Sequence, residues 1–408
     1  MFENQKILKW MRFLTFASIV VLVFFTFVSV SITALSHIFI FLPGIYFLAK
    51  AIQEKNYCLS KSGSALFALI IIGIVSIILN PMPLTKIFGL KYYFLGGILA
   101  PFAYADNFKY FFSKKKTKIL TNSVFLMAAF ASLVGIYALY TGFNPIKWKP
   151  AAHLFRASGL YGMYMTYGYG IGFLLICSFG LLIYWKRVKE FLGVKWHLLT
   201  FVINFLGLIL SATRGALLGF VVAIPLLFFQ KGKKWVVGTY LIGTIFLSAL
   251  TFGTSFGQKL FFERTYSNAQ RMSHFQAAYY AVKESPYFGL GFRNFESNSV
   301  RIKKEYNIEW SNIGGHAHNN FLEQMASTGF FGLIALLCFL FFWAKEMAAR
   351  KDLVGLVSIA FIAYFIGSGM VQYTFGDGEN VFFIMFIYAL GQSLPRLEFE
   401  KGEDNYGK

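Results

Sequence analysis

The chain has few charged residues, and acidic residues are the scarcest. Only 14% of its 408 side chains are charged, with 18 Asp and Glu against 38 Lys and Arg, whereas a soluble domain carries about 25% charged residues. This scarcity excludes a water-soluble globule. The three cysteines, Cys58, Cys177 and Cys338, are too few for a disulfide-stapled secreted module, and two of them lie inside apolar runs.

Apolar and aromatic side chains are abundant instead. Hydrophobic residues make up 57% of the chain, and its 50 Phe and 23 Tyr suit a surface that meets lipid tails and headgroups. A net charge of +20 would suggest a nucleic-acid partner in a soluble protein. In a membrane protein it first indicates topology, so we expect membrane lipids around this chain and no nucleic acid.

The apolar segments predict an all-α, polytopic membrane protein with about twelve transmembrane helices. A helix of roughly 17 to 25 apolar residues spans a bilayer. We interpret the chain as a single transmembrane domain over residues 1–408, because no repeat or linker divides it. The predicted segments are 13–35, 37–52, 63–80, 87–105, 119–141, 159–185, 197–212, 215–230, 235–252, 327–343, 353–373 and 380–395.

The distribution of Lys and Arg predicts the orientation. Most of these cations fall in loops on the side of the first residues, and basic loops collect on the cytoplasmic side. Both termini are therefore expected in the cytoplasm, and residues 253–320 form one large extracytoplasmic loop. The first apolar run is too long for a cleaved signal peptide and should remain as a helix.

The large loop itself is expected to contain helices. Arg271, Phe275, Ala278 and Val282 recur at helical spacing, and Pro286 ends the pattern. This spacing predicts a helix near the outer membrane face that holds Arg271 on the same stripe as its apolar anchors.

Arg214 interrupts an apolar stretch that runs from about residue 198 to 229. A guanidinium at membrane depth costs about 2.5 to 3.5 kcal/mol, so it needs a partner or an aqueous cavity. Arg214 either lies at a hairpin tip, with Gly215 making the turn, or binds an anionic ligand. Few carboxylates lie at that depth. Together with Arg271 it would suit a diphosphate, because each guanidinium can bind two oxygens.

Two of the six histidines, His316 and His318, lie two residues apart just before a predicted transmembrane helix. The ordinary pKa of histidine, near 6.5, allows it to take a proton from a hydroxyl. Two other interpretations stay open. The pair could bind a metal if Glu323 or His274 supplied a third ligand, or both rings could cap the following helix together with Asn319.

Other segments give weaker signals. The Tyr-rich stretch 161–169 is expected to form an interfacial aromatic belt. Asp377 and Glu379 are the only carboxylates in the short outer loops, where they could orient a histidine or hold a sugar but more simply form a turn. A Walker loop, which a nucleotide-driven pump needs, is absent, and the outer loops have no Asp-x-Asp pair for Mg²⁺. We therefore expect no metal or cofactor.

The order of these motifs resembles the O-antigen ligase and polymerase superfamily of bacterial GT-C-type membrane glycosyltransferases. The resemblance covers about residues 200–335. Its motifs are Ser211-Ala-Thr-Arg214, then Arg271 followed by Ser285-Pro-Tyr-Phe-Gly-Leu-Gly-Phe292, then His316-Ala-His-Asn-Asn-Phe-Leu322 and Gly329-Phe-Phe-Gly332. Phe275 departs from the pattern, which has Trp after the loop arginine.

The resemblance implies transfer of a glycan from undecaprenyl diphosphate to an acceptor hydroxyl, without metal, at the periplasmic face of the bacterial inner membrane. It implies that Arg214 and Arg271 bind the diphosphate, that His318 is the catalytic base and that His316 assists or orients it. Chain length and the single large loop are most similar to the lipopolysaccharide ligases, which implies an inverting enzyme with lipid A-core as the acceptor.

Two alternatives stay open. An O-antigen polymerase would use a second lipid-linked repeat as its acceptor. A non-enzymatic flippase for polyprenyl-diphosphate glycans would bind the same headgroup without reaction, but it should place charges along the whole depth of its pathway. The polar residues here gather at one face, which favours catalysis.

Overall fold

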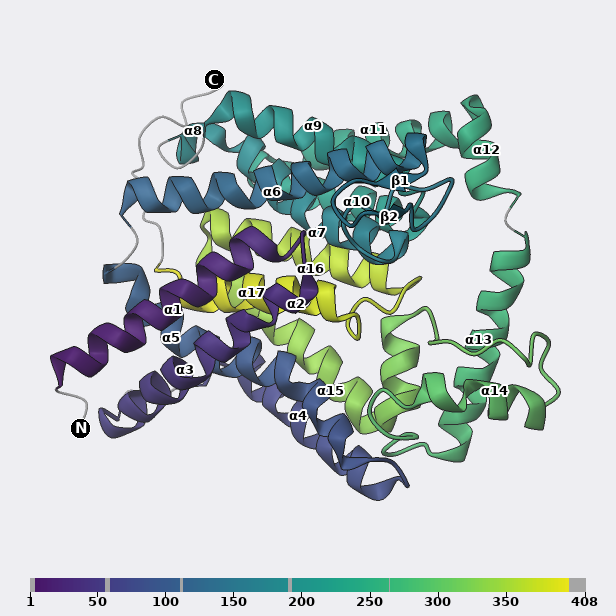
Figure 1. Ribbon diagram of the computed structural model, residues 1–408, viewed down its shortest axis with the longest axis horizontal. Helices are drawn as coiled ribbons and strands as arrows, with labels where there is room; N and C mark the ends of the chain where they lie inside the picture. The colour runs from purple at the N-terminus through teal and green to yellow at the C-terminus, as the bar shows by residue number, and fades with distance from the viewer. Residues whose placement is uncertain (1–3, 56–58, 111–112, 190–192, 264, 396–408) are drawn as a thin grey trace.

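The computed structural model describes residues 4–55, 59–110, 113–189, 193–263 and 265–395, and these residues are almost entirely helical (Figure 1). This confirms the predicted all-α, polytopic fold. The first half contains the helices α1 (Gln5–Phe25), α2 (Val30–Thr33), α3 (Leu35–Gln53), α4 (Lys61–Leu79), the 3-10 helix η1 (Leu84–Leu90), the π-helix η2 (Tyr92–Leu99), α5 (Ala100–Tyr110) and α6 (Lys114–Thr141).

A short antiparallel hairpin, β1 (Phe143–Asn144) and β2 (Lys149–Pro150), follows α6. The second half contains α7 (Tyr164–Ile183), α8 (Trp185–Val188), α9 (Val194–Leu210), α10 (Arg214–Leu227), η3 (Phe229–Lys231), α11 (Lys233–Gly253), α12 (Ser255–Phe261), α13 (Thr265–Glu284), α14 (Phe295–Glu305), α15 (Asn320–Arg350), α16 (Leu353–Gly369) and α17 (Gly378–Ser393).

Each of the twelve predicted apolar segments overlaps a helix, but fewer helices reach full spanning length. In the described part of the chain, nine helices are long and apolar enough to cross a membrane. α9 and α16 are shorter apolar helices, and α17 has only 16 residues. The first span was also predicted too late, because α1 begins at Gln5, where the Asn4 side chain caps it, and ends at Phe25.

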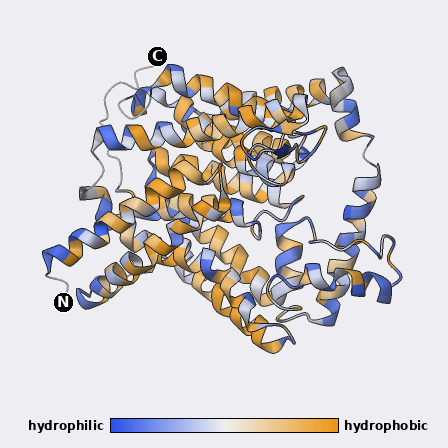
Figure 2. Ribbon diagram, in the orientation of Figure 1, coloured by the Kyte–Doolittle hydropathy of each residue, from blue (hydrophilic) through white to orange (hydrophobic). Residues whose placement is uncertain are grey.

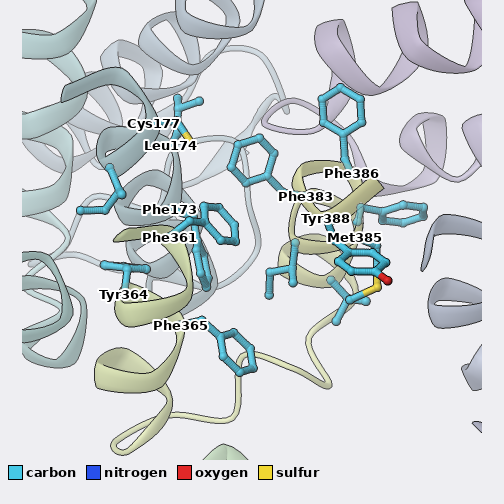
Figure 3. Packing of buried hydrophobic residues seen from close by; sticks show 14 of the residues in the cluster. Phe173, Leu174, Cys177, Phe361, Tyr364, Phe365, Phe383, Met385, Phe386 and Tyr388 are labelled. Atoms are coloured by element: carbon cyan, nitrogen blue, oxygen red, sulfur yellow. The ribbon is translucent and has the colours of Figure 1, made fainter. Parts of the chain in front are cut away.

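The core of the bundle lies where α7, α16 and α17 meet. Figure 3 shows aromatic side chains of these three helices turned toward one another. The ring of Phe173 on α7 lies 4.7 Å from that of Phe361 and 4.6 Å from that of Tyr364, both on α16. By contrast, α11 has no buried residue and packs beside α10 (Figure 1), as expected for a helix that faces lipid.

Three of the four tyrosines in the stretch 161–169 belong to this core, so the predicted interfacial belt is wrong for them. Tyr161, Tyr167 and Tyr169 are each at most 4% exposed. The Tyr161 hydroxyl donates to the carbonyl of Thr26 at 2.7 Å, and the Tyr167 hydroxyl donates to Ser132 Oγ at 2.7 Å. Buried tyrosines are tolerated where their hydroxyls find such partners.

The segment 253–320 stands apart from the bundle at the end opposite the start of α1 (Figure 1). Its helices α12, α13 and α14 are more hydrophilic than the bundle (Figure 2). The predicted loop helix is present as α13, which ends before Pro286 as its sequence pattern indicated. A small separate apolar core, which includes Ala278, Phe295 and Ile302, holds α13 and α14 together.

A bend in α15 attaches this segment to the bundle. The bend lies at Gly329, whose φ is +70°, and a Cβ there would lie 2.1 Å from the backbone of Tyr287. Only glycine permits both the left-handed backbone and this approach. The Phe330 N–H then donates to the Pro286 carbonyl at 2.8 Å. The part of α15 before the bend therefore rises beside α13 and positions the chain around residues 314–320.

Candidate functional site

The first part of the site is the start of α10. The chain turns there through Ala212, which has a φ of +52°, and the hydroxyls of Ser211 and Thr213 hydrogen-bond at 3.0 Å. Arg214 is the first helical residue, and its Nη2 donates to Asn268 Oδ1 at 2.8 Å. Asn268 lies on α13, so Arg214 does not lie at a free hairpin tip. Its guanidinium bridges the bundle and the segment 253–320.

One face of α13 then connects Arg214 to the histidines. Asn268, Arg271 and His274 follow at spacings of three residues, which places them on the same side of the helix. Asn268 contacts Arg214, and the ring of His274 lies 5.7 Å from the ring of His318. Arg271 is less than one turn, about 5.4 Å, from either neighbour. The structure therefore brings Arg214, Arg271 and His318 together along a single wall.

The two histidines lie in an irregular segment between α14 and α15. Their ring centroids are 4.4 Å apart. Gly315 allows this segment to approach α13, because a Cβ at Gly315 would lie 2.9 Å from Cε1 of His274. His318 has a left-handed backbone, with a φ of +48°. A left-handed backbone is strained in a residue other than glycine. Residues strained in this way are concentrated at functional sites, where the surrounding structure holds them in place.

Side chains at the start of α15 hold this segment in place. Asn319 Oδ1 accepts hydrogen bonds from the Phe321 and Leu322 N–H groups at 2.9 and 3.0 Å, so it caps α15. The capping interpretation is correct for Asn319 but wrong for the two histidine rings, which contact Gln372 instead. The buried Glu323 accepts from the Ala317 N–H at 2.7 Å. Glu323 thus holds the peptide between the two histidines. In the described ranges, no three His, Cys, Asp or Glu side chains are grouped to hold a metal ion.

Gln372 contacts both histidines, although no sequence motif indicated it. It lies in the connection between α16 and α17, and its Oε1 is 2.7 Å from Nδ1 of His318, while its Nε2 is 3.1 Å from Nε2 of His316. An amide oxygen only accepts and an amide nitrogen only donates. His318 therefore carries its proton on Nδ1, and the lone pair of its Nε2 remains available. His316 also carries its proton on Nδ1, but the lone pair of its Nε2 is occupied because it accepts the hydrogen bond from the Gln372 amide.

The histidines are neutral at physiological pH. Burial lowers the pKa of His318 to about 3 and that of His316 to about 4, and the positive charge of Arg271 lowers both further. Burial likewise lowers the pKa of His274 to about 3. A negatively charged ligand beside Arg271 would offset these positive charges and raise the pKa of His318 toward the ordinary value of histidine.

Arg156, from the connection between the hairpin and α7, is a third arginine of this site. Its guanidinium lies 4.1 Å from the ring centroid of Tyr164. Burial lowers the pKa of Arg156, and the charge of Arg271 lowers it again, which places the two within electrostatic range. Arg214 is within range of both. No sequence motif singles out Arg156, because its position near the other two arginines depends on tertiary packing.

Comparisons with known proteins agree with this arrangement. Residues 199–337 match the family described as O-antigen ligase, which confirms the resemblance predicted over about residues 200–335. Arg214, Arg271, His316 and His318 all lie inside the match, whereas Arg156 and Gln372 lie outside it.

A protein of Haemophilus influenzae (strain ATCC 51907 / DSM 11121 / KW20 / Rd), described only as uncharacterized, is also similar. It is 23% identical over 229 residues, which cover 48% of this chain and 56% of that protein. The chain thus spans about half the length of this relative.

Proposed function

From the O-antigen ligase match over residues 199–337, we propose that this chain is an inverting, metal-independent O-antigen ligase. It moves a glycan from undecaprenyl diphosphate to lipid A-core. The match and the apolar helices support the broader statement directly: a multi-pass membrane protein of the O-antigen ligase and polymerase type, which acts on lipid-linked glycans. Donor, acceptor and residue roles belong to the proposal.

The observation that carries the proposal is the single wall formed by Arg214, Arg271 and His318. A polyprenyl diphosphate cannot leave the bilayer, so its enzyme must present positive charge where the membrane ends. Arg214 begins a helix of spanning length, and Arg271 lies on α13 outside the bundle. Two guanidinium groups at this level can bind a diphosphate through paired hydrogen bonds, and Arg156 adds a third positive charge.

The chemistry follows from the position of His318. Its Nε2 accepts the proton of an acceptor hydroxyl, and the hydroxyl oxygen forms a bond to the anomeric carbon of the donor sugar. The bond from that carbon to the diphosphate oxygen breaks, and its electron pair leaves with undecaprenyl diphosphate. Attack from the face opposite the leaving group inverts the anomeric carbon. The arginines stabilise the charge on the departing diphosphate, which is the larger share of such catalysis.

Gln372 and the arginines connect donor binding to this proton transfer. Gln372 holds Nδ1 of His318 and leaves Nε2 free toward the acceptor. Without donor, the low pKa of His318 makes it a weak base. A bound diphosphate neutralises the arginine charge, raises this pKa and strengthens the base. His316, whose Nε2 is engaged by Gln372, orients the pair.

The proposal places the site in the periplasm. The segment 253–320 and the start of α1 lie at opposite ends of the bundle (Figure 1). With the basic loops in the cytoplasm, both termini are cytoplasmic, and the site faces the periplasm from the bacterial inner membrane.

Reconstitution of the purified chain in lipid nanodiscs tests the function. The donor is an undecaprenyl-diphosphate glycan, offered with either lipid A-core or a second lipid-linked repeat, and the His318→Ala variant is the matched control. The proposal predicts glycosylated lipid A-core at a rate that EDTA does not change. A longer lipid-linked glycan would instead identify a polymerase. Translocation of the donor across liposomes with no new product would identify a flippase and overturn the enzyme.

A further inference from the structure

Arg293 is a partly buried arginine whose charge acts on His316. It follows Phe292, a buried residue whose ring lies 6.2 Å from that of Tyr93 on η2. This anchor directs the Arg293 side chain along η1, where a Cβ at Gly89 would lie 3.9 Å from its Nη1. Arg293 is therefore held between the segment 253–320 and the helices η1 and η2.

The same side chain adjoins the connection that carries Gln372. The next residue of that connection, Tyr373, has its ring 5.8 Å from the ring of His316. Arg293 is within electrostatic range of Tyr373 and of Asp377, and its charge also acts on His316. The charges that act on Arg214 are those of Arg271 and Arg156. Arg293 thus adjoins His316, and its charge is not among those that act on Arg214.

Two features mark Arg293 as more than a packing residue. Its φ of +55° is left-handed, a conformation that costs a non-glycine residue about 1 kcal/mol or more. In the parts of the chain that the structure describes, it also forms no ion pair. Asp377, a carboxyl that acts on Arg293, has its pKa raised to about 8 by burial and by its hydrogen bond to Glu379. The raised pKa makes Asp377 a weaker counter-charge for Arg293 than an ionised partner in a salt bridge would be.

We propose that Arg293 binds an anionic group, a phosphate or a carboxylate, on the acceptor saccharide. The proposed function assigns the donor diphosphate to Arg214 and Arg271, so Arg293, which adjoins His316 and does not act on Arg214, is left for the acceptor whose hydroxyl must reach His318. A positive charge there favours a charged acceptor over a neutral one. The inference rests on the proposed function only in identifying this anion as part of the acceptor.

The test measures binding without turnover. The full chain in nanodiscs is titrated with a soluble, phosphorylated core oligosaccharide and with the same oligosaccharide after removal of its phosphates. The wild type is expected to bind the phosphorylated form about ten-fold to a hundred-fold more tightly, as one charge-assisted contact allows. The variant Arg293→Gly should lose this preference and keep the affinity for undecaprenyl diphosphate.

The glycine variant also limits the risk of misfolding. Glycine adopts a φ of +55° freely, so Arg293→Gly removes the guanidinium and relaxes the backbone. Its thermal stability should equal or exceed that of the wild type. Arg301→Gln is the matched control, because Arg301 pairs with Glu284 at 2.6 Å and with Glu305 at 2.7 Å on the outside of α14. This control should retain the phosphate preference.

Three results would overturn the role of Arg293: a phosphate preference that survives in Arg293→Gly, a wild type that binds neither oligosaccharide, or a variant that loses undecaprenyl diphosphate as well. Failure of the proposed function has a different signature. In that case the reconstituted chain transfers no glycan, while the oligosaccharide preference and its loss in Arg293→Gly persist. Transfer without any preference would remove the Arg293 inference alone.

Discussion

The two ends of the bundle hold their arginines differently. At the end where α1 begins, Arg350 pairs with Asp352 at 2.8 Å and donates to two carbonyls at the end of α17, and Arg12 pairs with Asp106 at 2.7 Å. At the opposite end, Arg214 and Arg271 have no carboxylate partner among the residues that the structure describes. Both ends belong to one chain, so the difference in arginine pairing arises from the residues around each arginine.

This difference separates structural charge from functional charge. A paired, buried arginine completes hydrogen bonds that hold helices together, and removing one partner leaves an uncompensated charge. Clustered arginines without carboxylates repel one another until an anion binds. Among the described residues, no carboxylate neutralises the positive charges of Arg214 and Arg271 in the free protein, as expected for a site that binds a negatively charged ligand.

The largest expected effect comes from His318, the group that the arginines surround. His318→Ala should lower the transfer rate by about 1,000-fold, within the range for loss of a general base, while donor binding stays near the wild-type value. Transfer is measured in the reconstituted system, and donor binding by titration. His316→Ala should lose less, because His316 orients rather than accepts the proton. A His318→Ala enzyme that still transfers at the wild-type rate would exclude the residue as the base.

A variant of Arg214 tests more directly whether an arginine without a carboxylate partner contributes to transfer. Arg214→Lys keeps the charge but loses the planar fork, so transfer should fall by about 100-fold, as after loss of one transition-state contact. The matched control is Arg301→Lys at the paired outer face of α14, which should stay within about two-fold of the wild-type rate. Equal rates for the two variants would show that an unpaired arginine has no special role here.

A smaller effect is expected from Gln372→Glu, and it is measured as a shift in the pH dependence of kcat/KM. In the wild type, the lowered pKa values of His318 and His316 keep both rings neutral down to about pH 4. The acid limb of kcat/KM should therefore lie near pH 4, well below the ordinary value of 6.5. The added carboxylate raises both pKa values, so the limb should move up by one pH unit or more. An unchanged limb would mean that Gln372 does not control the protonation of the pair.

The smallest effect on transfer is expected at the paired end. Arg350→Gln removes the positive charge that pairs with the buried Asp352, so the free energy of unfolding should fall by about 3 kcal/mol. Transfer per folded molecule should be unchanged. Thermal unfolding in detergent and transfer by the folded fraction measure the two quantities. A specific loss of transfer without destabilisation would contradict the division between the two ends.

Much of the fold follows from local sequence, but parts of the site do not. Hydropathy locates each spanning helix in the described part of the chain, and motif order selects Arg214, Arg271 and His318 as candidates. Hydropathy could not show that Tyr167 is buried, because the partner of its hydroxyl is Ser132 on another helix. Gln372 lies 54 residues from His318 and has no sequence motif of its own. Contacts of this kind exist only once the helices are assembled.

The central claim is that the unpaired arginines bind the diphosphate of a polyprenyl donor beside His318. Equilibrium binding of undecaprenyl diphosphate and undecaprenyl phosphate to the protein in nanodiscs tests it most directly. The wild type should bind the diphosphate at least about ten-fold more tightly, and the double variant Arg214→Gln, Arg271→Gln should lose that preference. Equal affinity for the two lipids in the wild type, or a preference that survives in the double variant, would contradict the claim.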